Sequence, residues 1–329
     1  MERSDFQLKI ITTEEHFDTN KNVKEFNEFS KVPNNNPFQE KLNKDLTDAD
    51  SRIAYMDKYG IDMQIISDAG NSPQVLPDDK TVDACKAQND SLAETVSQHP
   101  DRLAGLAALP VNVPDEAAKE LERAVTKLGL KGAIISGPIN GQFLDQAKFD
   151  PIFATAEKLD VPLYLHPGVM TDDQKAILFD SSAYSDMMAN MMAGAAWGWH
   201  MEQGVQMARL VFSGLFEKHP NLKLISGHWG EFVPMFIERL DVFGRFSELP
   251  HPFSYYYRKN VYVGPSGMLT APQLQMVHTE MGADHMLYSE DYPYVKMEDK
   301  VKSFIEDAPF NDKDREMMAH GTAEKLFKL

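Results

Sequence analysis

The sequence KIITTEEH, residues 9–16, places a short apolar run directly before two acids and an imidazole. On a β-strand, residues two positions apart point to the same face. If the run is a strand, Glu14 and His16 therefore converge at its carboxyl end. Carboxylate oxygens and imidazole nitrogens are both common ligands of divalent metals. The stretch predicts part of a metal site, provided that other strands end in similar side chains.

Seven further apolar runs follow along the chain, and helical patterns separate them. The expected strands cover 63–70, 103–110, 132–138, 161–167, 223–230, 261–267 and 285–293, and helical spacing is found at 48–59, 80–99, 115–128, 149–159, 231–243 and 272–281. Such alternation is typical of parallel strands joined by helical crossovers, and eight units suit an α/β fold of the (β/α)8 TIM-barrel type. An open doubly wound sheet is the alternative, but neither GxGxxG nor GxxxxGK[ST] is present.

A polar segment at about 18–48, rich in Asn, Lys and Pro, follows the first expected strand. It predicts an insertion or lid rather than a core element. The length of 329 residues is compatible with one barrel domain that spans residues 1–329.

The composition narrows the class of protein. With 33 basic and 50 acidic side chains, the chain has a net charge of -17 and no basic block, which argues against a nucleic-acid partner. No stretch reaches the roughly 18 apolar residues of a membrane span, and the N-terminus lacks the apolar core of a signal peptide. Cys85 is the only cysteine, so no internal disulfide forms and a cytoplasmic location is expected.

Three more of the expected strands end in side chains that bind metals or move protons. His166 and His228 follow the fifth and sixth apolar runs, and Asp291 follows the eighth. In a barrel these residues meet Glu14 and His16 at the carboxyl-terminal mouth, where such enzymes do their chemistry. The set therefore predicts a metal centre.

Glu231 and His200 can each be interpreted in two ways. Glu231 lies three positions after His228, so it either orients that histidine or is an ordinary acid in the first turn of a helix. His200, in the sequence WGWH, could line the pocket, but packing on a helix face is favoured. The other histidines are expected at turns, on helices or at a strand start: His99, His219, His251, His278, His285 and His320.

Four motifs, EEHF, YLHPG, SGLFEKHPNLKLISGHWGE and YSEDYPY, resemble the amidohydrolase-related branch of the metal-dependent amidohydrolase superfamily. The sequence is most similar to the non-oxidative decarboxylases of γ-resorcylate (2,6-dihydroxybenzoate), 5-carboxyvanillate and aminocarboxymuconate semialdehyde. The resemblance implies a barrel of the metal-dependent hydrolase type with one divalent ion per chain, Zn²⁺ or Mn²⁺. It assigns the metal ligands to Glu14, His16, His166 and Asp291.

The same resemblance assigns roles around the metal. It makes His228 and Glu231 catalytic, and it places Arg52 and Arg239 against the substrate carboxylate, one of them across a dimer interface. A homodimer or a dimer of dimers is therefore expected. The clustered methionines at 187–192 suit core or subunit-interface packing. Gly168 stands where resorcylate-type sequences carry a larger polar residue, which leaves the substrate open.

Three functions follow as hypotheses. The first is decarboxylation of a hydroxylated aromatic acid, in which the metal chelates the substrate, Asp291 protonates the ring carbon and His228 handles the phenolic proton. The second is hydrolysis of a small lactone, ester or amide by a metal-bound hydroxide, with Asp291 as the base. The third is a metal-free binding or scaffold protein, against which the five matched site residues argue.

Overall fold

The computed structural model describes residues 8–19, 21–24, 37–68, 72–139 and 141–329. Its strands are β1 (Ile11–Phe17), β2 (Met63–Asp68), β3 (Leu103–Gly105), β4 (Ala107–Ala108), β5 (Ala133–Ser136), β6 (Leu163–His166), β7 (Leu224–Ser226) and β8 (Val261–Val263). All their pairings are parallel, in the orders β1-β2-β3 and β4-β5-β6-β7-β8. β3 and β4 are the two halves of the strand expected at 103–110. Between them, the Leu106 amide donates to the Ile66 carbonyl at 2.9 Å, so the two groups form one sheet.

The sheet closes on itself through the chain that follows β8. Leu287 N donates to Val263 O at 2.9 Å, and Thr13 N donates to Tyr288 O at 2.9 Å. The eighth segment therefore lies between β8 and β1, as a TIM barrel requires. The expected (β/α)8 barrel is confirmed.

The eighth segment differs from the expected strand at 285–293. Among the described residues it forms one isolated parallel bridge, at Met286, and two separate backbone bonds from β1, Thr13 N to Tyr288 O and His16 N to Tyr292 O. The amides of Glu290 and Tyr292 donate instead to the two carboxylate oxygens of Glu15, each at 2.9 Å. The Glu15 side chain thus adds to the backbone bonds between β1 and this segment.

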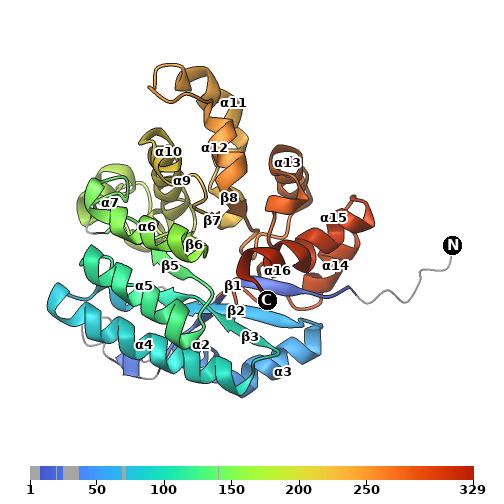
Figure 1. The fold of residues 1–329 in the computed structure, drawn as a ribbon. Coiled ribbons are helices and arrows are strands. Elements are labelled where there is room, and N and C mark those ends of the chain that lie inside the picture. The colour runs from blue at the N-terminus through green and yellow to red at the C-terminus, as the bar shows by residue number, and fades with distance from the viewer. Residues whose placement is uncertain (1–7, 20, 25–36, 69–71, 140) are drawn as a thin grey trace.

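Helices surround the strands on the outside of the barrel, and α16 lies near the centre of the view in Figure 1. They are α2 (Pro37–Thr47), α3 (Ala49–Tyr59), α4 (Asp78–Gln98), α5 (Pro114–Leu128), α6 (Asp150–Leu159), α7 (Asp172–Leu178), α8 (Asp186–Ala193), α9 (Gly198–Phe212), α10 (Leu215–Lys218), α11 (Val233–Gly244), α12 (Phe253–Asn260), α13 (Ala271–Met281), α14 (Lys300–Glu306), α15 (Asp312–Glu316) and α16 (Thr322–Phe327). The ends of α3 illustrate how capping residues set the ends of a helix. The Asp48 side chain accepts from Ser51 N at its start, and Gly60 takes the left-handed conformation, φ 72°, at its end.

The core has two layers, and alternate residues of each strand fill them. On β5, Ile134 points into the barrel, whereas Ala133 and Ile135 pack against the outer helices. On β6, Tyr164 points inward between Leu163 and Leu165. Both faces of these strands are therefore buried, which is why they read as continuous apolar runs. His166, two residues beyond Tyr164, shares the inward face.

A bulge in β1 decides where its polar side chains point. Thr12 pairs with Gln64 and Glu15 pairs with Ile66, so two residues of β1 stand opposite Ile65 alone. Ile11 belongs to the inner layer, and strict alternation would turn Glu14 and His16 outward. The extra residue reverses the phase, and both side chains face the inside of the barrel mouth.

The insertion expected after β1 and the methionine cluster lie outside the barrel core. Within the expected insertion at 18–48, α2 packs Leu42 and Leu46 together, while 20 and 25–36 lie outside the described residues, so its role as a lid stays a prediction. The single-domain organisation stays a prediction as well.

Of the four clustered methionines, Met187, Met188 and Met191 are exposed and do not fill the core of this chain. In the described part of the chain, no helix combines the length and the apolar character that crossing a membrane needs.

Candidate active site

Three side chains from two strands meet at the carboxyl-terminal mouth of the barrel. Glu14, His16 and His166 offer ligand atoms that all lie within 4.8 Å of one another, and all three residues are buried. Asp291 adjoins them, with its Oδ1 3.0 Å from His16 Nε2. The structure thus brings together the four residues that the sequence assigned to the metal.

Hydrogen bonds fix both imidazole rings in one orientation. His16 Nδ1 lies 3.0 Å from Asp68 O, and His166 Nδ1 lies 2.7 Å from Pro167 O. A carbonyl oxygen only accepts hydrogen bonds, so each Nδ1 carries the proton and each Nε2 is left for the site. This orientation is the one that metal-binding histidines usually take.

Each free nitrogen faces a carboxylate. His16 Nε2 faces Asp291, and His166 Nε2 lies 3.5 Å from Glu14 Oε1. Burial opposes charge on His16, yet the adjacent Asp291 and Glu14 raise the pKa of this histidine to about 9. Burial, with His16 and His228 nearby, lowers the pKa of His166, which keeps that ring neutral. One divalent cation in contact with these four groups would satisfy them all, so the residues fit a metal ion.

Glu14 supplies the clearest test of that fit. Its Oε2 accepts hydrogen bonds from the hydroxyls of Tyr164 and Ser266. Within the described residues its Oε1 is buried without a hydrogen-bond partner. Burial raises the pKa of Glu14 to about 7 against the opposing effect of nearby histidines such as His228. A buried carboxylate with one hydrogen-bonded oxygen and one oxygen without a donor suits a metal ligand.

His228 and Glu231 come from a turn with an unusual backbone. The residues from His228 to Phe232 all have positive φ, between 44° and 78°. This turn delays the start of α11 to Val233, so the helix expected from Glu231 begins two residues later. It also folds Glu231 back, so that its Oε1 lies 2.7 Å from His228 Nδ1. The orienting interpretation of Glu231 is the one that the geometry favours, although no helix provides it.

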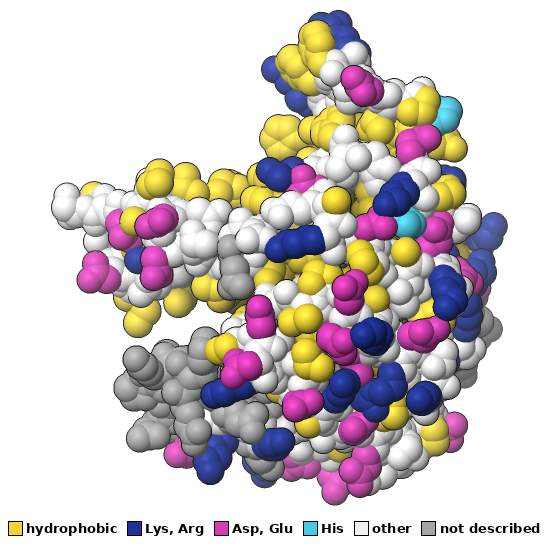
Figure 2. All heavy atoms as spheres, turned by 60° about the vertical axis from the view of Figure 1, so that its left-hand side comes forward, with side chains coloured by type: hydrophobic (Ala, Val, Ile, Leu, Met, Phe, Trp, Pro, Cys, Tyr) yellow, Lys and Arg dark blue, Asp and Glu magenta, His cyan; other side chains and the backbone are white. Residues whose placement is uncertain are grey.

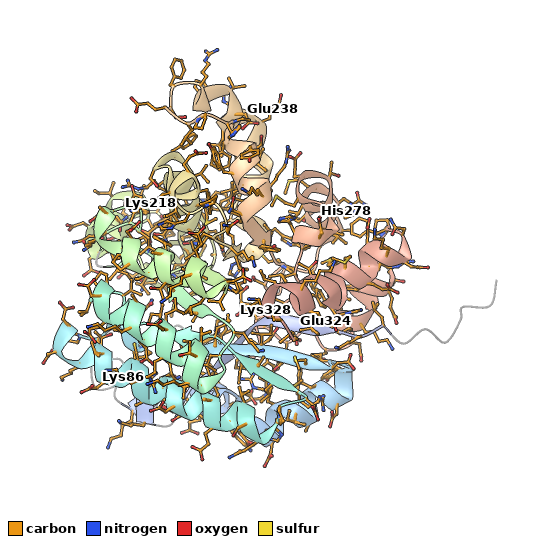
Figure 3. All side chains as sticks on the ribbon, viewed as in Figure 1. Lys86, Lys218, Glu238, His278, Glu324 and Lys328 are labelled. Carbon is orange, nitrogen blue, oxygen red and sulfur yellow. The ribbon has the colours of Figure 1, made fainter. Side chains whose placement is uncertain are left out.

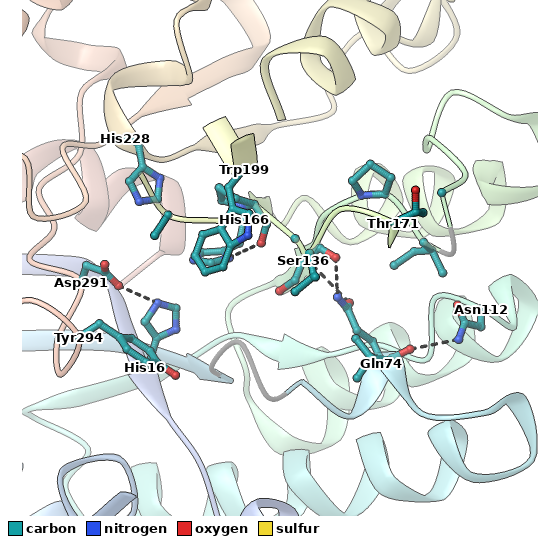
Figure 4. Close-up of a pocket in the computed structure, with 18 of the residues that line it drawn as sticks. His16, Gln74, Asn112, Ser136, His166, Thr171, Trp199, His228, Asp291 and Tyr294 are labelled. Carbon is teal, nitrogen blue, oxygen red and sulfur yellow. Dashed lines mark hydrogen bonds and ion pairs between the residues drawn. The ribbon is translucent and has the colours of Figure 1, made fainter. Parts of the chain in front are cut away.

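A cavity of about 700 Å³ opens above these residues. Figure 4 shows His16, His228 and Asp291 at one end and Gln74, Asn112 and Thr171 toward the other. Apolar side chains make up much of its wall: Val75, Pro138, Ile139, Val169, Trp199 and Val295. Asp291 is the most exposed of the four metal-site side chains, at 16%, so it faces the cavity most openly.

The two arginines do not reach this cavity. Arg52 is buried, where its guanidinium donates to Gln64 Oε1 at 2.9 Å and to the carbonyl of His16. It therefore supports the backbone of a metal-site residue. Arg239 is exposed on α11, over the ring of Phe243 at 4.7 Å. A contact between either arginine and a substrate stays a prediction.

Sequence reasoning missed two residues of the site. Glu15 accepts hydrogen bonds from the amides on both sides of Asp291, and both partners lie about 275 positions away in sequence. Packing on a helix face was expected for His200, but this side chain contacts the turn after β7, where its Nδ1 lies 2.7 Å from Glu231 Oε2. Its place in an aromatic-rich run four residues before Gly204 was the one available signal. Other histidines lie where expected, such as His278 on α13, at the outside of the molecule (Figure 3).

Known proteins with similar sequences and structures include metal-containing decarboxylases and amidohydrolases. Residues 26–329 match the family model described as Amidohydrolase. The γ-resorcylate decarboxylase of Polaromonas sp. is 32% identical over 97% of this chain and 98% of its own length. A putative amidohydrolase from Staphylococcus aureus is 38% identical, covering 98% of this chain and 100% of that one, with a TM-score of 0.88. A dihydroxybenzoic acid decarboxylase from Polaromonas sp., solved with manganese and the inhibitor 2-nitroresorcinol, is 32% identical over 98% and 97%, with a TM-score of 0.88.

Proposed function

The chain belongs to the amidohydrolase family, and on that premise we propose that it is a metal-dependent decarboxylase of a hydroxylated aromatic carboxylic acid. One observation carries the proposal. The Nε2 atoms of His16 and His166 face the carboxylates of Asp291 and Glu14 at one end of a largely apolar cavity that His228 also lines. A polar, metal-fitting end and an apolar wall together suit a flat acid with ring hydroxyls.

The metal would be held by Glu14, His16, His166 and Asp291. Mn²⁺ is the ion of a related decarboxylase, and Zn²⁺ suits the same mixture of carboxylate and imidazole ligands. When bound, the ion supplies Lewis-acid stabilisation and a template for the carboxylate and the adjacent hydroxyl of the substrate. It also gives an acidic protein a local positive charge for an anionic substrate.

Asp291 would deliver the proton on which the reaction depends. Its position at the cavity wall lets a protonated carboxyl group reach the ring carbon that bears the carboxylate. After protonation of that carbon, the bond to the carboxylate breaks, CO₂ leaves, and the electron pair restores the aromatic ring. Glu15, through the amides of Glu290 and Tyr292, holds the turn on which Asp291 sits.

His228 would take and return the phenolic proton. Its Nδ1 donates to Glu231, so its Nε2 is the nitrogen available to the cavity. Burial opposes charge on His228, but Glu231, Glu14 and Asp291 raise the pKa of this histidine to about 10, which favours the form that holds the proton. In its Nδ1–H form the imidazole would accept the proton of the substrate hydroxyl while the ring carbon is protonated. Glu231 would keep the ring in this tautomer and stabilise its charged form.

A second copy of the chain would complete the molecule. Exposed apolar side chains gather near the mouth and on α11, namely Val169, Ile177, Met187, Met191, Trp197, Met235, Phe236, Phe243 and Phe246. α11 stands at the top of Figure 1, and hydrophobic side chains cluster at the top of Figure 2. Contiguous exposed apolar side chains often mark a protein–protein interface. A homodimer or dimer of dimers would cover it, and Arg239, on the same helix, would then meet the substrate carboxylate of the other copy.

A cytoplasmic location is part of the proposal. Cys85, the only cysteine, is free and buried, as is common in a reducing compartment. Fractionation of the native cells with an antibody to the chain would test this location.

The function is tested by assaying protein loaded with Mn²⁺ or Zn²⁺ on a panel of hydroxybenzoates, carboxyvanillate, lactones and esters. The expected result is release of CO₂ from an acid with a hydroxyl next to its carboxylate. In D₂O, the product must carry one deuterium on the carbon that lost CO₂. Ring opening of a lactone or cleavage of an ester, without CO₂ release, would replace the proposal with the hydrolase alternative.

A further inference from the structure

The carboxylate of Glu231 lies between two imidazoles, of which only one lines the cavity. Its Oε1 is 2.7 Å from His228 Nδ1, and its Oε2 is 2.7 Å from His200 Nδ1. The Glu231 side chain has 0% exposure and that of His200 has 12%. His200 stands behind His228, with ring centroids 4.6 Å apart. The arrangement thus extends the catalytic pair by one residue, away from the substrate.

The protons of His200 follow from its partners. Nδ1 faces a carboxylate oxygen, and Nε2 faces the carbonyl oxygen of Ala195 at 2.9 Å. Both partners are acceptors, so each contact is a hydrogen bond only when the ring nitrogen in it carries a proton. Burial opposes the charge of Glu231, but His228 and His200 keep its pKa below the usual value. A proton on His200 Nδ1 thus gives the buried Oε2 of Glu231 a hydrogen-bond donor.

Close packing of α9 holds His200 in this place. A Cβ added at Gly204 would lie only 2.5 Å from the backbone oxygen of Glu231, so glycine alone lets α9 approach the turn. A Cβ added at Gly198 would lie 2.3 Å from Ala193 O, which lets the chain fold back sharply before α9. That fold presents the Ala195 carbonyl to His200 Nε2. Both glycines therefore help to place His200 between Glu231 and Ala195.

We infer that His200 is a positioning residue that locks the carboxylate of Glu231 and, through it, the ring and tautomer of His228. The inference rests on the proposed function for the role of His228, whereas the contacts stand by themselves. Without His200, Glu231 Oε2 would be a buried acceptor with nothing to accept from, and the carboxylate could rotate or take up a proton. His228 Nδ1 would then lose its fixed acceptor, and the ring could change tautomer.

A matched pair of substitutions separates this role from packing. In His200→Asn the amide nitrogen stands in for Nδ1, and in His200→Gln it stands in for Nε2. If His200 acts through Glu231, the Asn variant keeps kcat within about threefold, while the Gln variant loses at least about tenfold, since misplaced general bases cost rate in this range. KM and the metal content stay within about twofold in both variants, because His200 touches neither substrate nor metal.

Other outcomes contradict the inference. Gln equal to or better than Asn would mean that the contact with Ala195 matters and the one with Glu231 does not. Equal losses in both variants, or none, would exclude positioning through Glu231, and a change confined to KM would indicate a binding role. Two divalent ions per wild-type chain, one of them lost in His200→Asn, would make His200, His228 and Glu231 a second metal site instead.

A spectroscopic measurement tests the inference without turnover. Zn²⁺-loaded protein with ¹⁵N-labelled histidine should show a His200 ring whose Nδ1 carries a proton, a signal that is absent in His200→Asn. The Nδ1–H signal of His228 should stay sharp in wild type and Asn, and should be broadened by exchange in Gln. A His200 ring with a bare Nδ1 would overturn the inference. If no acid is decarboxylated but these signals are found, the proposed function fails and the positioning of His228 stands.

Discussion

Substituting Gly204 with alanine should disturb His228 from outside the cavity. The new Cβ would lie 2.5 Å from Glu231 O, whereas an ordinary contact needs at least 3.4 Å, so α9 and the turn must separate by up to 0.9 Å (3.4 − 2.5). The 2.7 Å contact between His200 and Glu231 would then stretch to about 3.6 Å, beyond hydrogen-bonding distance. The substitution should therefore reduce activity although it touches no substrate.

The expected size follows from the same geometry. Overpacking of this kind costs about 1–3 kcal/mol of unfolding free energy. An unfolding entropy of about 2.1 cal/mol/K per residue over 329 residues turns this loss into a Tm about 1–4 °C lower. kcat should fall at least about tenfold, as in His200→Gln, while metal content stays unchanged.

The assay compares two glycines of the same chain by thermal unfolding, turnover and metal analysis. Gly244→Ala, at the end of α11, is the matched control, since its Cβ would meet Phe212 at an ordinary 3.4 Å. That variant should be neutral or slightly stabilised, because alanine has the higher helix propensity. If Gly204→Ala keeps the Tm and kcat of Gly244→Ala, α9 does not hold the Glu231 turn in the way described.

Three further predictions concern the metal, the acid and the assembly. His166→Ala should lose most of the bound ion in elemental analysis, whereas His228→Ala should keep it; equal metal content in both would be inconsistent with the ligand set. Asp291→Asn should keep more metal than His166→Ala but lose about 10²–10⁴ in kcat, because an amide cannot donate an acid proton; a loss below about tenfold at full metal would refute the role. Light scattering should give at least twice 37.1 kDa, and Met187→Lys should weaken the dimer; a mass of one chain at micromolar concentration would rule out the assembly.

The residues of the candidate metal site could be predicted because they lie at or just beyond the carboxyl ends of buried apolar runs. His166 comes after LYL and Asp291 after LYSE, and in parallel strands such positions meet at one end of the sheet. Helix ends were equally accessible, since Asp48 and Gly60 act through bonds to residues a few positions away. Because a helix cap bonds to residues only a few positions away, the residue types at both ends of the helix can be recognised in the sequence.

Arg52 and His200 show where that reasoning stops. Nothing near Arg52 in sequence reveals that Gln64 and the His16 carbonyl surround its guanidinium, or that it lies behind the site and not in it. Nothing near His200 reveals Glu231, which is 31 residues away. Both contacts join separate elements, and their partners are chosen by how those elements pack.

The sequence by itself determined the alternation of strands and helices, the barrel, and the side chains that gather at its mouth, because burial of both strand faces and local capping depend on neighbouring residues. Only the tertiary structure decided which way those side chains point. The bulge opposite Ile65 turns Glu14 and His16 inward, and the positive-φ turn after β7 aims Glu231 at two histidines. Such features depend on register and on close approach between distant segments, so only packing of the whole chain sets them.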